Sequence, residues 1–178
     1  MVGREYKWYV LYTRSQHEKQ LHRDFGRRCI ESYLPLAPSI RFWSDRTKIV
    51  DMPLFPNYLF VRASCREYTF IDEHRSVIGF VKTGREPSEV PDSTMEMLKI
   101  ALNEKMELLR CREEPVKGGR VAVVRGPLEG FEGEVIDYCG KNFLLIEVKQ
   151  ISQCLMVRIN TDSVRIIEEK PKHCALIL

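Results

Sequence analysis

The chain has 178 residues, of which 44% are hydrophobic and 30% are charged, a balance typical of a soluble globular protein with one large or two small domains. Its longest apolar runs have the length of strands and no leader-like segment opens it, so we expect no membrane span and no secretory signal. The net charge is only +3, but residues 1–50 carry ten Lys and Arg against five Asp and Glu, and this local excess can attract phosphate groups.

A buried strand and an amphipathic helix are the first predicted elements. Residues 8–13 combine aromatic and β-branched side chains, which is typical of a central strand. Ser15 and Glu18 have the spacing of a capping box, which would start a helix by satisfying free backbone N–H groups. The apolar positions of this helix, which we expect to face the sheet, are Leu21, Phe25 and Cys29.

Short strands dominate the next part of the chain. A hairpin tip is predicted at 44–46, and a second short helix at 66–74. The segments that have strand composition are 31–36, 47–52, 58–62 and 77–82.

A second amphipathic helix is predicted after Pro91. Ser93 and Glu96 again have the spacing of a capping box. The apolar stripe that follows comprises Met95, Leu98, Leu102, Met106 and Leu109. A charged segment and Pro115 end the stripe, which indicates a linker.

The C-terminal part has the signals of a small β-barrel. A clean strand at 120–125 leads into the segment Gly126 to Gly133, in which glycines recur beside Pro127 and Phe131, and another strand follows at 142–149. Five short strands before Ile167 favour an SH3-like barrel.

These elements predict an α+β N-terminal domain, in which helices flank an antiparallel sheet, followed by a small all-β SH3-like barrel. The limits predicted for the parts are 5–109 for the first domain, 110–117 for a linker, 118–168 for the barrel and 169–178 for a C-terminal tail.

The sequence lacks the short motifs that are typical of common enzymes and metal sites. No phosphate-binding loop, nucleophile elbow or His-x-x-x-His pair occurs, and the six cysteines are scattered. We therefore expect a binding protein with reduced thiols, no catalytic residues, no metal and no cofactor.

Three motifs together resemble the NusG family of transcription elongation factors: the strand Trp8 to Thr13, the tract Pro53 to Val61 (PLFPNYLFV), and the Gly126 to Gly133 loop, which is similar to a KOW element. The resemblance covers about residues 6–167 and implies an NGN-like domain followed by a KOW domain. Asn57, where housekeeping members usually carry Gly, is similar to specialised RfaH-like members, and the layout resembles the capsule-operon antiterminators of the UpxY type.

The resemblance implies a site for RNA polymerase on the fourth predicted strand. Alternation should place Leu59 and Val61 inward and leave Tyr58 and Phe60 exposed together on the opposite face. In the family this face docks on the clamp helices of the largest polymerase subunit, with Phe55 and Trp8 nearby as the more core-like members. A buried strand is the alternative reading of the same pattern.

Two further contacts to the transcription complex follow from the same resemblance. Thr69 is the nearest match to a polar motif that touches the polymerase gate loop, while its neighbour Phe70 has core as an alternative. Arg14 and Arg75 match basic positions that contact non-template DNA. Lys19, Arg23 and Arg27 could extend this basic track, and Tyr12 could stack on an unpaired base.

On the barrel, Ile151 matches an exposed apolar residue that packs against the small-ribosomal-subunit protein NusE. The function implied is that of a cytoplasmic, specialised elongation and antitermination factor, not an enzyme, that promotes transcription of long surface-polysaccharide operons. The alternatives are a housekeeping factor that couples polymerase to Rho or the ribosome, and a ribosome-associated KOW protein that binds RNA.

Overall fold

The computed structural model describes residues 5–42, 47–110, 118–138 and 141–168, and the chain forms two compact units, Met1–Met95 and Glu96–Leu178. The division lies earlier than the predicted domain limit at residue 109. The predicted hairpin tip at 44–46, most of the predicted linker and the predicted tail at 169–178 lie outside the described residues.

The N-terminal unit is built on an antiparallel sheet in which β1 is central, as its composition predicted, with β5 on one side and β6 on the other. β2 extends the sheet beyond β5, and β9 pairs with β1. The strands of this sheet are β1 (Lys7–Thr13), β2 (Ser32–Tyr33), β5 (Tyr58–Ala63), β6 (Val77–Phe80) and β9 (Glu89–Val90).

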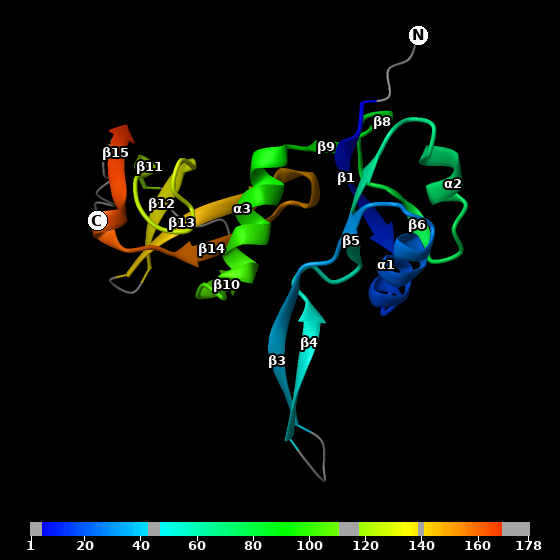
Figure 1. Cartoon of the computed structure of the whole chain (residues 1–178), viewed down its shortest axis with the longest axis horizontal. Helices are drawn as coiled ribbons and strands as arrows, with labels where there is room; N and C mark the ends of the chain where they lie inside the picture. Colours follow the sequence, from blue (N-terminus) through cyan, green and yellow to red (C-terminus); the bar gives the residue numbers. More distant parts are fainter. Residues whose placement is uncertain (1–4, 43–46, 111–117, 139–140, 169–178) are drawn as a thin grey trace, which may run out of the picture. The chain divides into compact units, whose positions relative to one another are not determined.

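Two helices, α1 (Glu18–Arg27) and α2 (Tyr68–Asp72), pack on the same face of this sheet (Figure 1). Leu21, Phe25 and Ile71 bury their side chains against the strands. The apolar spacing in the first predicted helix indicated this position for Leu21 and Phe25. The strand residues in this core are Tyr9, Leu11, Leu59, Val61, Ala63, Val77 and Phe80.

Cys29, which the stripe placed on the sheet side, is exposed, so that prediction is wrong. The helix ends at Arg27, and Cys29 has a φ of +56°, so its backbone has already left the helical path.

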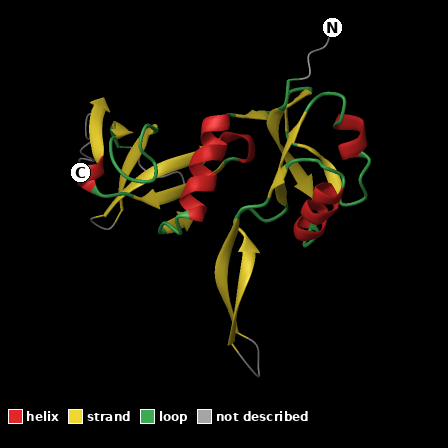
Figure 2. Ribbon diagram, viewed as in Figure 1, coloured by secondary structure: helices red, strands yellow, loops and turns green. Residues whose placement is uncertain are grey.

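A separate two-stranded ribbon leaves the sheet between β2 and β5. Its strands are β3 (Leu36–Phe42) and β4 (Thr47–Pro53), which pair along their whole length (Figure 2). An isolated ribbon of two strands has little core of its own, and Ile49 at its side is well exposed. A second, much shorter hairpin joins β7 (Lys82–Thr83) and β8 (Glu86–Pro87).

The helix predicted through Leu109 is shorter than its apolar stripe. α3 spans Asp92–Asn103, and Lys105 has a φ of +50°, which ends the helical path. Leu108 and Leu109 belong instead to β10 (Leu108–Arg110), which pairs with β14 of the C-terminal unit. Because α3 begins at Asp92, Ser93 lies inside it, so the second capping box is also wrong.

The C-terminal unit is a six-stranded antiparallel sheet in the order β10-β14-β13-β12-β11-β15. β12 pairs with β11 through its first residues and with β13 through its last, so it takes part in two ladders, as a strand at the corner of a bent sheet does. Its remaining elements are β11 (Arg120–Val123), β12 (Glu132–Tyr138), β13 (Lys141–Val148), β14 (Gln153–Arg158), β15 (Val164–Glu168) and the 3₁₀ turns Lys149–Ile151 and Thr161–Ser163.

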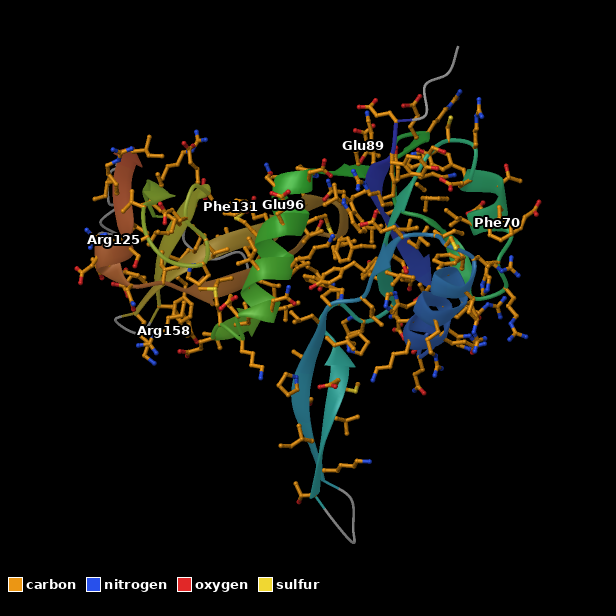
Figure 3. The ribbon with its side chains drawn as sticks, in the orientation of Figure 1. Phe70, Glu89, Glu96, Arg125, Phe131 and Arg158 are labelled. Carbon is orange, nitrogen blue, oxygen red and sulfur yellow. The ribbon has the colours of Figure 1, made fainter. Side chains whose placement is uncertain are left out.

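The Gly126 to Gly130 loop between β11 and β12 shows why glycines recur there. Gly126 has a φ of +97° and Gly130 a φ of +88°, values that other L-residues rarely adopt. Between them Leu128 is buried, while Phe131 remains half-exposed (Figure 3). The loop therefore folds back over its own leucine.

Candidate protein and nucleic-acid interface

The alternation predicted for β5 is confirmed. Leu59 and Val61 enter the core under α1 and α2, and Tyr58 and Phe60 therefore point to the opposite face of the sheet. Val10 lies directly across from Phe60 in the β1–β5 ladder and shares that opposite face.

Phe60, in contrast, is not exposed. Its side chain is 0% exposed, and its ring packs edge-on against that of buried Phe55 with 5.9 Å between centroids. Trp8 and Val10, on the same face, are buried as well. The predicted exposure of Phe60 is wrong, because both faces of this part of the sheet are buried. The alternation of side chains along a strand shows which residues share a face, but it does not show whether that face meets water or other apolar side chains.

The aromatic surface that remains open belongs to Tyr12 and Tyr58. These residues face each other in the β1–β5 register, and their ring centroids lie 5.5 Å apart. Tyr12 is 41% exposed and Tyr58 is half-exposed. The sequence had suggested Tyr12 only as a base-stacking residue, because its pairing with Tyr58 depends on the register between two distant strands.

Asn57 occupies a backbone position that few residues tolerate. Its φ is +69°, its N–H donates to Oε1 of Glu18 at 2.8 Å, and its C=O accepts the N–H of Thr13 at 2.7 Å. Glycine and asparagine are the residues that adopt this conformation most readily. The choice of Gly or Asn here therefore follows from backbone geometry.

Replacing Asn57 with alanine is expected to lower the free energy of unfolding by about 1–2 kcal/mol, because alanine is strained at positive φ. Asn57→Gly, the matched control, should stay within about 0.5 kcal/mol of the wild type. Urea-induced unfolding measures both. Equal stability of the alanine and glycine variants would contradict the left-handed conformation.

Glu18 does not form the predicted capping box. It is the first residue of α1, only 5% exposed, and its carboxylate is bonded to the backbone of Asn57 rather than to its own helix. His17, which precedes the helix, makes no side-chain cap either. The buried carboxylate thus joins the start of α1 to the tract that leads into Tyr58.

Arg14 and Arg75, 61 positions apart in the chain, lie on two loops that the sheet brings together. Arg14 follows β1 and Arg75 precedes β6, and these two strands are antiparallel neighbours. The N–H of Arg14 donates to the C=O of Ser76 at 3.0 Å, and both arginine side chains are exposed.

Lys19 and Arg23, which were predicted to extend the basic track, both lie on α1. The Nζ of Lys19 donates a hydrogen bond to the backbone C=O of Asp51 on β4, and Arg23 is exposed. An open cavity of about 590 Å³ lies between the end of α1 and the α2–β6 turn. Its lining comprises Asp24, Arg27, Arg28, Phe70, Glu73, His74 and Arg75.

Two members of this cavity, Arg28 and Phe70, were missed as functional residues. The guanidinium carbon of Arg28 lies 4.7 Å from the centroid of the Phe70 ring. Phe70, which is labelled in Figure 3, is 42% exposed. Core, the alternative considered for Phe70, is therefore wrong. In the sequence, two signals could have indicated this site: the adjacent arginines at 27 and 28, and an aromatic residue within a charged segment. Thr69, beside it on α2, is exposed.

His74 forms part of the wall of the cavity, and its pKa is lowered there. Burial lowers its pKa below the ordinary value, and the charges of Arg28 and Arg75 act in the same direction, whereas Asp24 opposes them. Its Nδ1 accepts the N–H of Ser76 at 3.2 Å, and its ring packs edge-on against Phe25. The lining holds three guanidinium groups and two carboxylates, and this excess of positive charge makes the cavity electropositive.

Ile151 was expected to be an exposed apolar residue on the barrel, and that expectation is wrong. It closes the 3₁₀ turn Lys149–Ile151 and is only 8% exposed. Ser152 follows with a φ of +50°, which turns the chain sharply into β14. The apolar member of the turn is directed inward and its polar neighbour Lys149 outward.

Comparison with known proteins decides the family. Residues 6–99 match the family model described as "Transcription termination factor nusG", which is more than half of the chain. The chain belongs to the NusG family.

One relative in this family is a protein of Borreliella burgdorferi named "Transcription termination/antitermination protein NusG". It is 26% identical over 155 residues, which cover 74% of this chain and 83% of that protein. A solved structure described as "Domain interaction in Thermotoga maritima NusG" covers 92% of this chain and 98% of its own, with a TM-score of 0.52 and 21% identity. At that identity the likeness concerns the fold alone.

Membership in the NusG family answers the question of enzyme or binding protein. The family consists of non-enzymatic transcription termination and antitermination factors, and this chain is a NusG-like factor of that kind. Over the ranges that the structure describes, none of the helices has the length and apolar character needed to cross a bilayer.

Proposed function

We propose that this chain binds RNA polymerase and the adjacent DNA in the cytoplasm and promotes processive transcription of long operons, in particular operons for surface polysaccharides. The observation that carries the proposal is the end of β1, where exposed Tyr12 and exposed Arg14 flank buried Thr13. An aromatic surface and a cationic surface therefore share one edge of the N-terminal unit, which acts as the NGN domain.

The aromatic surface is the docking site for the clamp helices of the largest polymerase subunit. Tyr58 and Tyr12 are the anchors, because each combines a large ring with a hydroxyl group that tolerates partial exposure. Phe60 and Phe55 are buried and pack on each other within the unit. Thr69 makes a second contact, to the gate loop across the polymerase cleft.

The cationic surface binds the non-template DNA strand, which is unpaired in the transcription bubble. Arg14 and Arg75 pair with phosphates, Lys19 and Arg23 lengthen the track, and the cavity with Arg28 and Phe70 offers a stacking plane for an unpaired base. Cationic and aromatic groups that lie together are the combination that single-stranded nucleic acids require.

The variant Arg14→Ala/Arg75→Ala is expected to bind transcription elongation complexes more weakly, and only when the non-template strand is present. Loss of two phosphate contacts should lower the slope of log affinity against log salt concentration by about 1.4. Fluorescence anisotropy of labelled protein on complexes with and without that strand measures both effects.

A matched control for this test is Arg66→Ala/Arg85→Ala, which removes two exposed arginines of the same unit that do not line the cavity. The control should retain wild-type affinity. Equal losses with and without the non-template strand would remove the DNA role of Arg14 and Arg75.

The mechanism proposed is differential binding. A factor that holds the closed, elongating polymerase more tightly than the opened, paused form shifts the population towards elongation without chemistry of its own. The C-terminal unit acts as a KOW domain that recruits a second partner, NusE, through the turn that contains Ile151. The linker between the two domains raises the effective concentration of each contact.

A housekeeping NusG-type factor that couples polymerase to Rho or the ribosome is the second candidate. It is favoured by the name of the Borreliella relative and by the geometry of Asn57, which explains Gly or Asn there without reference to specialisation. In vitro transcription through a Rho-dependent terminator separates the two: the specialised factor increases read-through, and the housekeeping factor increases termination.

A further inference from the structure

Ser76 lies where two loops meet, and its N–H, C=O and hydroxyl groups all form hydrogen bonds. Its N–H donates to Nδ1 of His74 at 3.2 Å, its C=O accepts the N–H of Arg14 at 3.0 Å, and its Oγ lies 3.1 Å from Nδ1 of His17. The residue is 0% exposed. A buried hydroxyl that loses its hydrogen-bond partner costs free energy, so the bond to His17 stabilises this arrangement.

These bonds join the loops that carry the two arginines. Arg14 belongs to the loop between β1 and α1, and Arg75 directly precedes Ser76. The ladder between β1 and β6 has a register shift between Tyr12 and Thr13, and its last pair, Thr13 and Val77, lies directly before the loops. Beyond that pair, the bonds of Ser76 to Arg14 and His17 join the two loops.

We propose that Ser76 is a positioning residue for nucleic-acid binding: its hydroxyl, bonded to His17, fixes the spacing of Arg14 and Arg75 so that both engage one strand together. This inference rests on the proposed DNA role of the two arginines. Groups held at a fixed spacing lose less conformational freedom on binding than groups on two independent loops, so the second phosphate contact costs less.

Ser76→Ala tests the inference in the full-length chain, with elongation complexes that contain or lack the non-template strand as the probe. The affinity that depends on the strand is expected to fall about three- to tenfold, the effect of one hydrogen bond. Ser64→Ala is the matched control, because Ser64 is also buried in the same unit and its Oγ is bonded to Glu67 at 3.2 Å. It should bind like the wild type.

A second variant guards against a simple loss of folding. His17→Ala removes the other end of the same hydrogen bond from a half-exposed position and is expected to produce the same loss as Ser76→Ala. Thermal melts of both variants should stay cooperative, and wild-type binding by the His17 variant would overturn the inference.

A double-mutant cycle separates positioning from mere structural support. In the Arg14→Ala/Arg75→Ala background, Ser76→Ala should cause no further loss, because the groups that it positions are absent. A loss that persists in this background overturns the inference. If the arginine variant itself binds like the wild type, the proposed DNA role fails first.

Discussion

Replacing Phe60 with alanine is expected to lower the free energy of unfolding by about 3–5 kcal/mol, the usual cost of removing a buried phenyl ring. The ring is fully buried and packs against Phe55, so its loss leaves a cavity that a β-strand cannot collapse to fill. Urea-induced unfolding followed by far-UV circular dichroism measures the change.

The control for Phe60 is Ile78→Ala, which truncates an apolar residue of the same unit that is 58% exposed. Its effect should stay within about 0.5 kcal/mol, as for surface substitutions in general. A Phe60 variant as stable as the Ile78 variant would mean that the ring is not core and would restore it as a docking residue.

The double variant Tyr12→Ala/Tyr58→Ala is expected to lose at least about 100-fold in affinity for RNA polymerase, because two aromatic anchors of an interface each contribute roughly 2 kcal/mol or more. Both rings are partly exposed, so most of this loss should appear in binding rather than in stability. Surface plasmon resonance with immobilised core polymerase measures the affinity.

Tyr138→Ala is the matched control for the tyrosine pair, since Tyr138 is 51% exposed on β12 of the C-terminal unit. It should bind polymerase normally. If the tyrosine variant lost affinity only in proportion to a fall in its melting temperature, the pair would be a structural element and not a docking surface.

How far the sequence predicts this molecule is best seen on β5. The period of two correctly assigned Leu59 and Val61 to one face and Tyr58 and Phe60 to the other, because side chains alternate along any strand. It could not tell that the face of Phe60 is also covered. Burial on that face depends on residues far away in the chain, which local pattern does not report.

The helices show the same limit at their ends. The stripe of α3 continues in sequence through Leu109, yet the chain leaves the helix near Lys105, and the last leucines pair with β14. The spacing of hydrophobic residues alone does not distinguish the apolar face of a helix from a half-buried strand. Here the pairing of β10 with β14 determines that Leu108 and Leu109 form a strand.

Only part of the candidate DNA site was predicted from the sequence, and the reason differs from that for the strands and helices. Arg14 and Arg75 were assigned through the family resemblance, and their proximity follows from the pairing of β1 with β6. Arg28 and Phe70 were not assigned, because an arginine over an aromatic ring is a contact between two elements. Such contacts leave no spacing rule within either segment.

Site-specific photo-cross-linking tests the central claim most directly. A benzophenone side chain is placed at Tyr58 in the full chain, with Tyr138 as the control position, and each protein is irradiated with RNA polymerase elongation complexes. A cross-link to the largest polymerase subunit is expected from position 58, and none to that subunit is expected from position 138. A cross-link from position 138 alone, or no polymerase cross-link from position 58, would contradict the claim.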